Sequence, residues 1–301
     1  MESLDLYHQN PVLMLRMITE YVVSGKDLSD TEKNRIIEHH QYIKKALKKD
    51  VSVEIEKMLL SDSPGKCFRY MHECKLLKYI IPQLDKCFYE QQRNKYHIYN
   101  VGEHIMHAVS AAPPVLSVRW AALLHDVGKP LCSSSDSAGT IHFYGHHIES
   151  RRIADDIMYR YNADSDLRRE VCILIEYHDV HFEQTETAVK RALSRLGEQG
   201  FLRLLDLQEA DIRAKNPIFI EDKCKSVNNL RQICMDVIKK GEPYRYTDLA
   251  IGKRDLIKMK YRAERQMRDV LRILFDEVIE NPALNNRDYL LKRAKNLKNK
   301  H

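Results

Sequence analysis

Imidazole and carboxylate side chains recur through the middle third of this 301-residue chain, on successive predicted helices. Nitrogen and oxygen donors together suit manganese, iron, cobalt, nickel or zinc, whereas an all-oxygen set would indicate calcium or magnesium. Because no thiolate belongs to the set, a structural zinc site is not expected. The pattern predicts a site for a divalent transition metal. In chain order the candidate donors are His104, His125, Asp126, His146, His147, His178 and Asp211.

The His125-Asp126 doublet is the centre of this pattern. It follows the apolar helical stretch 119–124 and precedes Gly128-Lys129-Pro130, where glycine and proline favour the end of a helix. Burying an imidazole and a carboxylate side by side is costly unless a partner compensates their charge. A divalent cation is the natural partner for such a pair.

The composition indicates that helices must position these donors. Hydrophobic residues make up 44% of the chain, Gly and Pro are scarce, and strict polar/apolar alternation is rare. We therefore expect an all-α fold with a multi-helix core, an N-terminal helical array and a C-terminal helical tail. A polar and aromatic connector at 91–100 separates the first two regions. The expected regions are residues 1–92, 93–220 and 221–301.

Individual helices can be placed from their caps and breaks. A capped helix is expected to begin at residues 29–30, since Ser29 or Asp30 can accept hydrogen bonds from first-turn amides. The small polar residues of Cys132–Thr140 are typical of an exposed, mobile connection. Three further helices should carry donors, at Val101–Ala111, Leu167–His178 and Glu198–Ala214.

The seven cysteines and the N-terminal residues indicate the compartment. The cysteines are odd in number and form no C-x-x-C pair, so neither a disulfide framework nor a zinc knuckle is expected. Residues 1–8 lack the pattern of a signal peptide, and no apolar run approaches the length that crosses a bilayer. We expect a cytoplasmic protein without a membrane segment.

The positive charge is concentrated at the C-terminal end. The net charge is +6, yet residues 253–301 hold fourteen basic and seven acidic side chains, so the preceding residues sum to about −1. This tail is the candidate surface for an anionic partner, either a nucleotide or RNA. Alternatively, its charges form solvated helix faces.

The ordered donors resemble those of the HD-domain metal-dependent phosphohydrolases. That family shows a helical His, then a His-Asp doublet followed by Gly-Lys, then Gly-His at a helix start, Tyr-His and Ala-Asp. The resemblance implies an HD domain over residues 93–220 and hydrolysis of a phosphoester by a metal-activated water. The matching residues here are His104, His125, Asp126, Lys129, His146, His178 and Asp211.

Segments flanking the donors resemble a more particular group, the bacterial CCA-adding tRNA nucleotidyltransferases. The likeness concerns the neck, HD and tail parts of those enzymes. Their catalytic head combines a Gly-Ser motif with a D-x-D pair, and no segment of these 301 residues combines the two, so nucleotide addition is not expected. The segments that carry the resemblance are 51–61, 76–82, 143–146, 210–217 and 248–257.

The HD resemblance implies a role for each donor. The first metal would be held by His104, His125, Asp126 and Asp211. Two alternatives exist for His146 and His178: they hold a second metal with Asp126 as the bridge, or they hydrogen-bond a substrate phosphate around a single metal. One or two ions are therefore expected.

The same resemblance implies the catalytic set, which is Asp126, Lys129, His146 and His178. Lys129 is positioned to meet a phosphate oxygen, and it shares substrate binding with His146 and His178. Either of these histidines could protonate the leaving alkoxide.

Neighbouring polar residues have simpler interpretations. They are expected to be capping, solvated or supporting groups rather than ligands, although His107 shares a helix face with His104 and could reach the site. These residues are Glu103, His107, His142, His147, Asp179 and His181.

Three functions follow from these interpretations. The first is a metal-dependent phosphohydrolase acting on nucleotides, cyclic phosphodiesters or RNA-end phosphates. The alternative is a head-less nucleotidyltransferase relative that binds tRNA-like RNA without catalysis of its own. In the third, an independent head protein associates with the chain to rebuild a split nucleotidyltransferase.

Overall fold

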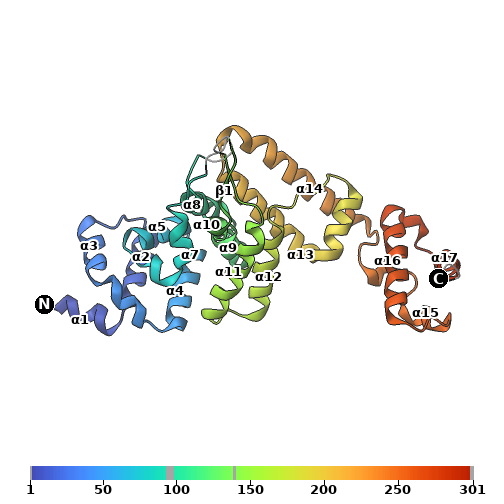
Figure 1. Ribbon diagram of the computed structural model, residues 1–301, viewed down its shortest axis with the longest axis horizontal. Helices are drawn as coiled ribbons and strands as arrows, with labels where there is room; N and C mark the ends of the chain where they lie inside the picture. The colour runs from blue at the N-terminus through green and yellow to red at the C-terminus, as the bar shows by residue number, and fades with distance from the viewer. Residues whose placement is uncertain (1, 93–97, 138–139, 299–301) are drawn as a thin grey trace. The chain divides into compact units, whose positions relative to one another are not determined.

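Helices dominate the computed structural model, which describes residues 2–92, 98–137 and 140–298 (Figure 1). The all-α prediction is confirmed, although two strands of two residues each are present in these ranges. No helix in them has the length and apolar character needed to cross a bilayer. Residues 93–97, within the expected connector, and Lys300 in the expected tail lie outside the described residues.

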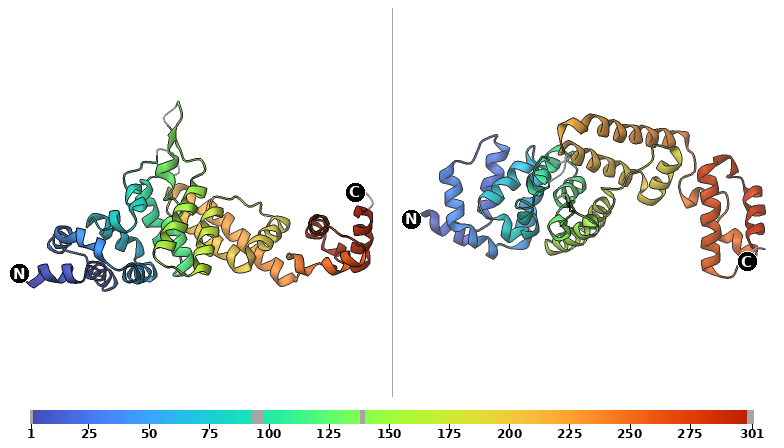
Figure 2. Two further views of the ribbon diagram at one scale, coloured as in Figure 1. Left: turned by 60° about the horizontal axis from the view of Figure 1, so that its bottom comes forward. Right: turned by 45° about the horizontal axis from the view of Figure 1, so that its top comes forward.

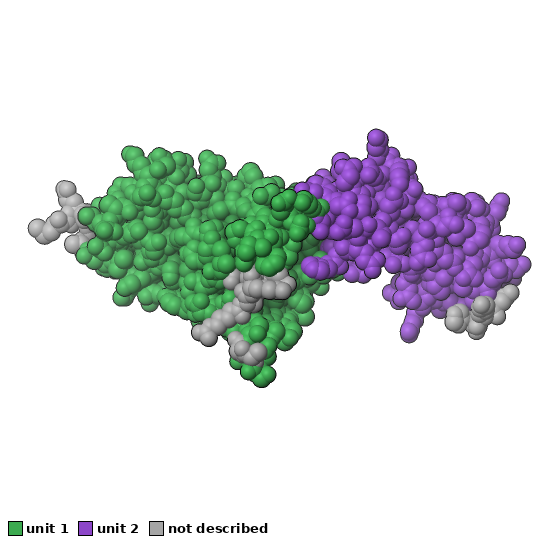
Figure 3. All heavy atoms as spheres, turned by 90° about the horizontal axis from the view of Figure 1, so that it is seen from above, with its two compact units in different colours: residues 1–180, 203–225 green, residues 181–202, 226–301 purple. Residues whose placement is uncertain are grey.

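The chain forms two compact units, which Figure 3 colours separately. Unit 1 comprises residues 1–180 and 203–225, and unit 2 comprises residues 181–202 and 226–301. All of the predicted metal donors belong to unit 1. The N-terminal helices pack with the donor-bearing helices in a single unit. The boundaries expected after residues 92 and 220 stay a prediction.

Short helices build the N-terminal part of unit 1. Ser29 forms the expected cap: its hydroxyl accepts the Glu32 N–H, and the Glu32 carboxylate accepts the Ser29 N–H. Helices α2, α4 and α5 pack against one another around apolar side chains. The helices are α1 (Glu2–Gln9), α2 (Leu13–Val23), α3 (Asp30–His39), η1 (His40–Lys45), α4 (Lys48–Leu60), α5 (Pro64–Glu73), α6 (Leu77–Ile80) and α7 (Pro82–Cys87).

Helices α8 (Val101–Ala111) and α9 (Leu116–Leu124) form the centre of unit 1. The bounds of α8 are those expected, and the Asn100 side chain caps it by accepting the Glu103 N–H at 2.7 Å. Helix α9 is almost entirely buried, because α4, α8 and α12 pack around it. The doublet that follows α9 is therefore enclosed by protein.

The connection at Cys132–Thr140 differs from its prediction. Strands β1 (Ser134–Ser135) and β2 (Ile141–His142) pair as an antiparallel hairpin that projects from the surrounding helices (Figure 2). Residues 133–137 are exposed, as expected of this connection, whereas the short hairpin was not expected. The Asp136 carboxylate closes the turn, since it accepts the Thr140 N–H at 2.9 Å. Helix α10 (Lys129–Cys132) precedes the hairpin and α11 (His146–Arg160) follows it.

Helices α11 and α12 (Ser165–Tyr177) pack together, and Asp164 caps α12 by accepting two backbone N–H groups. The helix expected at Glu198–Ala214 is the second half of α13 (Glu186–Arg213), after a break at Gly197, whose φ is +73°. Asp211 lies in the last turn of α13. Helix α14 (Ile220–Lys240) follows a short turn, η2 (Pro217–Phe219).

Helices α15 (Lys253–Lys258), α16 (Glu264–Glu280) and α17 (Arg287–Lys298) form the basic tail within unit 2, with the short turns η3 (Tyr246–Asp248) and η4 (Pro282–Leu284) beside them. Helix α16 packs against both of its neighbours. Part of the tail's charge is compensated internally: Arg293 pairs with Glu277 at 2.6 Å. Such pairs leave a smaller set of basic side chains for an anionic partner.

The close approach of α5 to α8 predicts a stability effect. A Cβ on Gly65 would overlap the backbone carbonyl of Met106, so α5 or α8 must shift. We expect Gly65→Ala to lower the free energy of unfolding by about 1–3 kcal/mol, as measured by urea unfolding. Gly200→Ala is the control, because its Cβ meets Leu196 at an ordinary 3.5 Å. Equal stability of the two variants would contradict this packing.

Candidate metal centre

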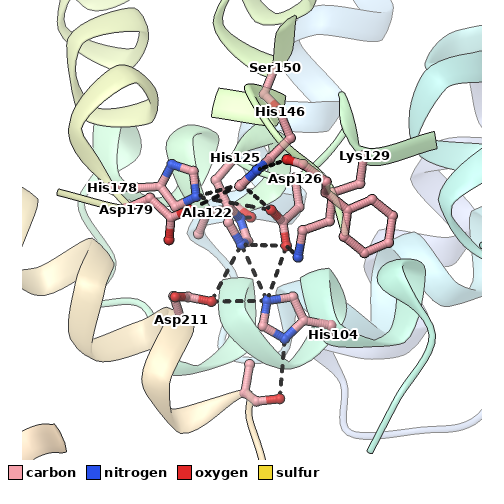
Figure 4. A network of polar contacts seen from close by, with 12 residues as sticks. His104, Ala122, His125, Asp126, Lys129, His146, Ser150, His178, Asp179 and Asp211 are labelled. Carbon is pink, nitrogen blue, oxygen red and sulfur yellow. Dashed lines mark hydrogen bonds and ion pairs between the residues drawn. The ribbon is translucent and has the colours of Figure 1, made fainter. Parts of the chain in front are cut away.

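Six predicted donors come together in one buried cluster inside unit 1 (Figure 4). In its first part, the Nε2 atoms of His104 and His125 lie 3.3 Å apart. The Asp211 Oδ1 atom lies 3.0 Å from His104 Nε2 and 3.6 Å from His125 Nε2. The Asp126 Oδ2 atom lies 3.3 Å and 3.2 Å from the same two nitrogens. Four donors from three helical segments thus converge.

The second part of the cluster uses the other face of the same carboxylate. The Nε2 atoms of His146 and His178 lie 3.3 Å apart. Asp126 Oδ1 lies 3.3 Å from His146 Nε2 and 4.0 Å from His178 Nε2. Asp126 is therefore shared, with Oδ2 toward the first histidine pair and Oδ1 toward the second.

Backbone carbonyls orient all four imidazoles in the same way. In each ring Nδ1 lies 2.7–3.3 Å from a carbonyl oxygen, which can only accept, so Nδ1 carries the proton. Each Nε2 is then the nitrogen with a lone pair to offer, and it faces the cluster. The accepting carbonyls belong to Ala214 for His104, Ala122 for His125, Phe143 for His146 and Ile175 for His178.

This orientation has an electrostatic consequence. When both rings of a pair are neutral, their Nε2 lone pairs face each other at 3.3 Å and repel, and neither can donate a hydrogen bond to the other. A proton or a metal ion between them removes the repulsion. Three groups of side chains are close enough together to hold a metal ion: His104, His125 and Asp211; His125, Asp126 and His178; and His146, His178 and Asp179.

Burial and charge set the protonation of the cluster. Burial lowers the pKa of His125, but the carboxylates of Asp126 and Asp211 outweigh it and raise that pKa to about 10. Burial and the charge of His125 lower the pKa of His178 to about 4. Burial would raise the pKa values of Asp126 and Asp211, but nearby His and Lys charges hold both well below their usual range. The centre is therefore anionic at its carboxylates, cationic at His125 and neutral at His178.

Two lysines stand beside the carboxylates. Lys129 Nζ lies 2.7 Å from Asp126 Oδ2 and donates to Gln92 Oε1 at 2.7 Å. Lys215 Nζ lies 2.5 Å from Asp211 Oδ2. Sequence reasoning did not single out Lys215, although its position four residues after Asp211 on one helical face was a usable signal.

A cavity of about 420 Å³ opens onto the cluster. Its wall combines the metal-capable groups, both lysines and the residues that join the hairpin to α11. A polar cavity with two ammonium groups suits an anionic ligand such as a phosphate. The lining residues are Asp126, Lys129, Ile141, His142, Phe143, Tyr144, Gly145, His146, His147, His178, Asp179, Asp211 and Lys215.

Close packing fixes the turn after the doublet. The Gly128 N–H donates to the Ser150 hydroxyl at 2.9 Å, and a Cβ on Gly128 would lie 2.6 Å from the Ser150 nitrogen. The glycine therefore lets this turn contact the first turn of α11, which starts at His146. This contact holds the His125-Asp126 doublet close to His146 of the second histidine pair.

The neighbouring polar residues occupy varied positions. His107 stacks on Tyr99 with ring centroids 4.3 Å apart, and Glu103 pairs with Arg69 at 2.7 Å. Asp179 lies nearer to the site than expected, with Oδ2 at 3.6 Å from His146 Nε2. His142 and His147 line the cavity without belonging to the donor groups named above.

Comparison with known families defines the class of this region. The family model described as the HD domain matches residues 95–216, which include every one of the converging donors. A second model, described as the probable RNA and SrmB-binding site of polymerase A, matches residues 29–88, which hold α3 to α7. Residues 95–216 therefore match the HD domain, as the donor pattern predicts.

Curated relatives extend this assignment. The chain is similar to the multifunctional CCA proteins of Azoarcus sp. (strain BH72), Cupriavidus necator and Aromatoleum aromaticum, with 31%, 28% and 32% identity. The alignments cover 46%, 54% and 42% of this chain and 33%, 41% and 31% of those relatives. The chain thus spans about a third to two fifths of their length. The predicted resemblance to CCA-adding enzymes is confirmed.

The cluster predicts that a metal ion stabilises the protein, and that of the two histidines of α8 only His104 is needed for this effect. We expect Mn²⁺ at about 100 times its Kd to stabilise the protein by about 2.7 kcal/mol, seen as a rise in Tm. His104→Ala should abolish this rise, because His104 Nε2 belongs to the cluster. His107→Ala, which removes the ring stacked on Tyr99, should retain it. Equal responses of the two variants would contradict the assigned ligand set.

Proposed function

We propose that the centre hydrolyses phosphoesters of nucleotides, cyclic phosphodiesters or RNA ends with the help of one or two divalent transition metal ions. The observation that carries this proposal is the arrangement of two histidine pairs around Asp126, next to a cavity that two lysines line. Membership of residues 95–216 in the HD class, which includes metal-dependent phosphohydrolases, supports it.

The donor set fits a transition metal. The first ion would be held by His104, His125, Asp126 and Asp211, and it would be Mn, Fe, Ni, Co or Zn. The position of Asp126 between the two histidine pairs favours a second ion held by His146 and His178. The alternative is that these two histidines hydrogen-bond a substrate phosphate beside a single ion. When bound, such a metal lowers the pKa of coordinated water and polarises a phosphoryl oxygen.

The chain's own groups would complete the reaction. Hydrolysis joins the oxygen of water to phosphorus and breaks the bond from phosphorus to the leaving oxygen. That oxygen must gain a proton, which His146 or His178 would supply in the one-ion alternative, where a proton rather than a second metal occupies Nε2. Lys129 and Lys215 would bind phosphate oxygens, since each ammonium group lines the cavity and contacts a ligand carboxylate.

Replacing the shared carboxylate tests the hydrolase. Asp126→Ala should lower kcat/KM for bis(p-nitrophenyl) phosphate and 2′,3′-cyclic AMP by about a hundredfold or more, because several kcal/mol of charge stabilisation are lost. Bound metal, measured by elemental analysis, should fall in parallel. Asp166→Ala, at an exposed position on α12, is the control and should keep both. Metal binding without turnover of any nucleotide, cyclic phosphate or RNA end would overturn the proposal.

A second candidate function is binding of tRNA-like RNA without catalysis. The match of residues 29–88 to an RNA-binding family model and the basic tail favour it. The metal centre would then stabilise the fold. Either function suits the cytoplasm, where all seven cysteines, which are free in the structure, would remain reduced.

RNA binding by the tail predicts a salt-dependent affinity. Removing Arg262, Arg265 and Arg268, which are exposed on and just before α16, should make the slope of log affinity against log salt shallower by about two units for a tRNA transcript. A control variant should keep the slope, since it removes three exposed arginines from α11 and α12. The control residues are Arg151, Arg152 and Arg169. Identical slopes for the two triple variants would exclude the tail as the RNA surface.

A further inference from the structure

An aromatic pair stands at the wall of the cavity, on the segment that joins the hairpin to α11. The rings of His142 and Tyr144 are stacked, with centroids 5.3 Å apart and planes 8° from parallel. Both residues line the same cavity as the histidine cluster. Tyr144 is 78% exposed although its ring already rests on His142, so it offers a face to a planar ligand.

Local contacts hold this pair in place. The His142 Nε2 atom lies 2.9 Å from the Asp136 carboxylate, which also closes the hairpin turn. Gly145 adopts φ +75°, a left-handed conformation that turns the chain directly after Tyr144. The next residue, His146, is buried in the cluster. An exposed aromatic ring and a metal-capable imidazole are therefore separated by a single glycine.

We propose that the His142–Tyr144 pair is a base-binding subsite, which takes the nucleobase of a nucleotide whose phosphate lies at the histidine cluster. The phosphate position rests on the proposed function, whereas the stacking surface stands on its own geometry. Tyr144 and His146 stand two positions apart in the chain and line the same cavity, so the aromatic pair and the cluster share one wall.

The chemistry of the cavity favours a nucleotide over other phosphoesters. Lys129 and Lys215 supply charge for the phosphate, but a sugar phosphate has no planar group for an exposed ring. Single exposed tyrosines are common and need no function. Tyr144 differs from them because its ring is paired in parallel, braced through Asp136 and placed on the wall of the charged cavity. Stacking tolerates every base, so little preference among bases is expected.

Two matched substrates test the subsite in the metal-loaded protein. The first is 2′,3′-cyclic AMP, and the second is methyl riboside 2,3-cyclic phosphate, which lacks the base. Tyr144→Ala should lower kcat/KM for the first by about tenfold through a higher KM, and leave the second unchanged. Tyr144→Phe should restore the wild-type ratio, because it keeps the ring. Tyr159→Ala removes an equally exposed tyrosine of α11 outside the cavity lining and should change neither.

Equilibrium binding provides a readout that does not need turnover. By titration calorimetry, the Kd of AMP should rise about tenfold in Tyr144→Ala and stay unchanged in Tyr159→Ala, while the affinity for ribose 5-phosphate is the same in all variants. If AMP binding shows this pattern but no phosphoester is hydrolysed, the subsite stands and the hydrolase fails. If hydrolysis occurs and Tyr144→Ala affects both substrates equally or neither, the subsite is wrong and the hydrolase stands.

Discussion

The structure of unit 1 depends on one buried carboxylate, Asp126. Its two oxygens face two separate histidine pairs, and Lys129 contacts the oxygen nearer the first pair. A charge buried to this degree is tolerated only when its surroundings compensate it. Several helices bring those compensating groups together: α8 supplies His104, α13 supplies Asp211, the end of α9 supplies His125, the start of α11 supplies His146 and the end of α12 supplies His178. The helical fold thus places the groups that compensate the Asp126 charge around that carboxylate.

Much of this arrangement could be predicted from the sequence, for identifiable physical reasons. Caps are local, so Ser29 begins a helix where the chain predicts one. The bounds of α8 were predictable because Asn100 starts it and a Pro-Pro pair stops it. The donors could be selected because their order along the chain matches that of a known family, which isolated histidines would not have allowed.

Other features were not predicted, although two of them rest on contacts between residues only four positions apart. The Cys132–Thr140 segment has the composition of a loop, yet a side-chain bond from Asp136 to the Thr140 amide closes it into a hairpin. Lys215 was overlooked because a lysine near a helix end is ordinarily a solvated cation, whereas here it contacts Asp211. The grouping of the N-terminal helices with the donor helices follows from packing of α4 and α5 on α8 and α9, which involves residues far apart in the chain.

Openness distinguishes the two functions that the centre could serve. A metal site that only stabilises a fold is closed by its protein ligands, whereas a catalytic site keeps a position for water or substrate. Here the carboxylates of Asp126 and Asp211 and the imidazoles of His146 and His178 line a cavity of about 420 Å³. Lys129 and Lys215 in the same wall compensate these carboxylates, and their ammonium groups also offer positive charge to an anionic ligand. Their presence is useful when a negatively charged group enters between them and the metal, and this arrangement favours chemistry on a phosphoester over a purely structural centre.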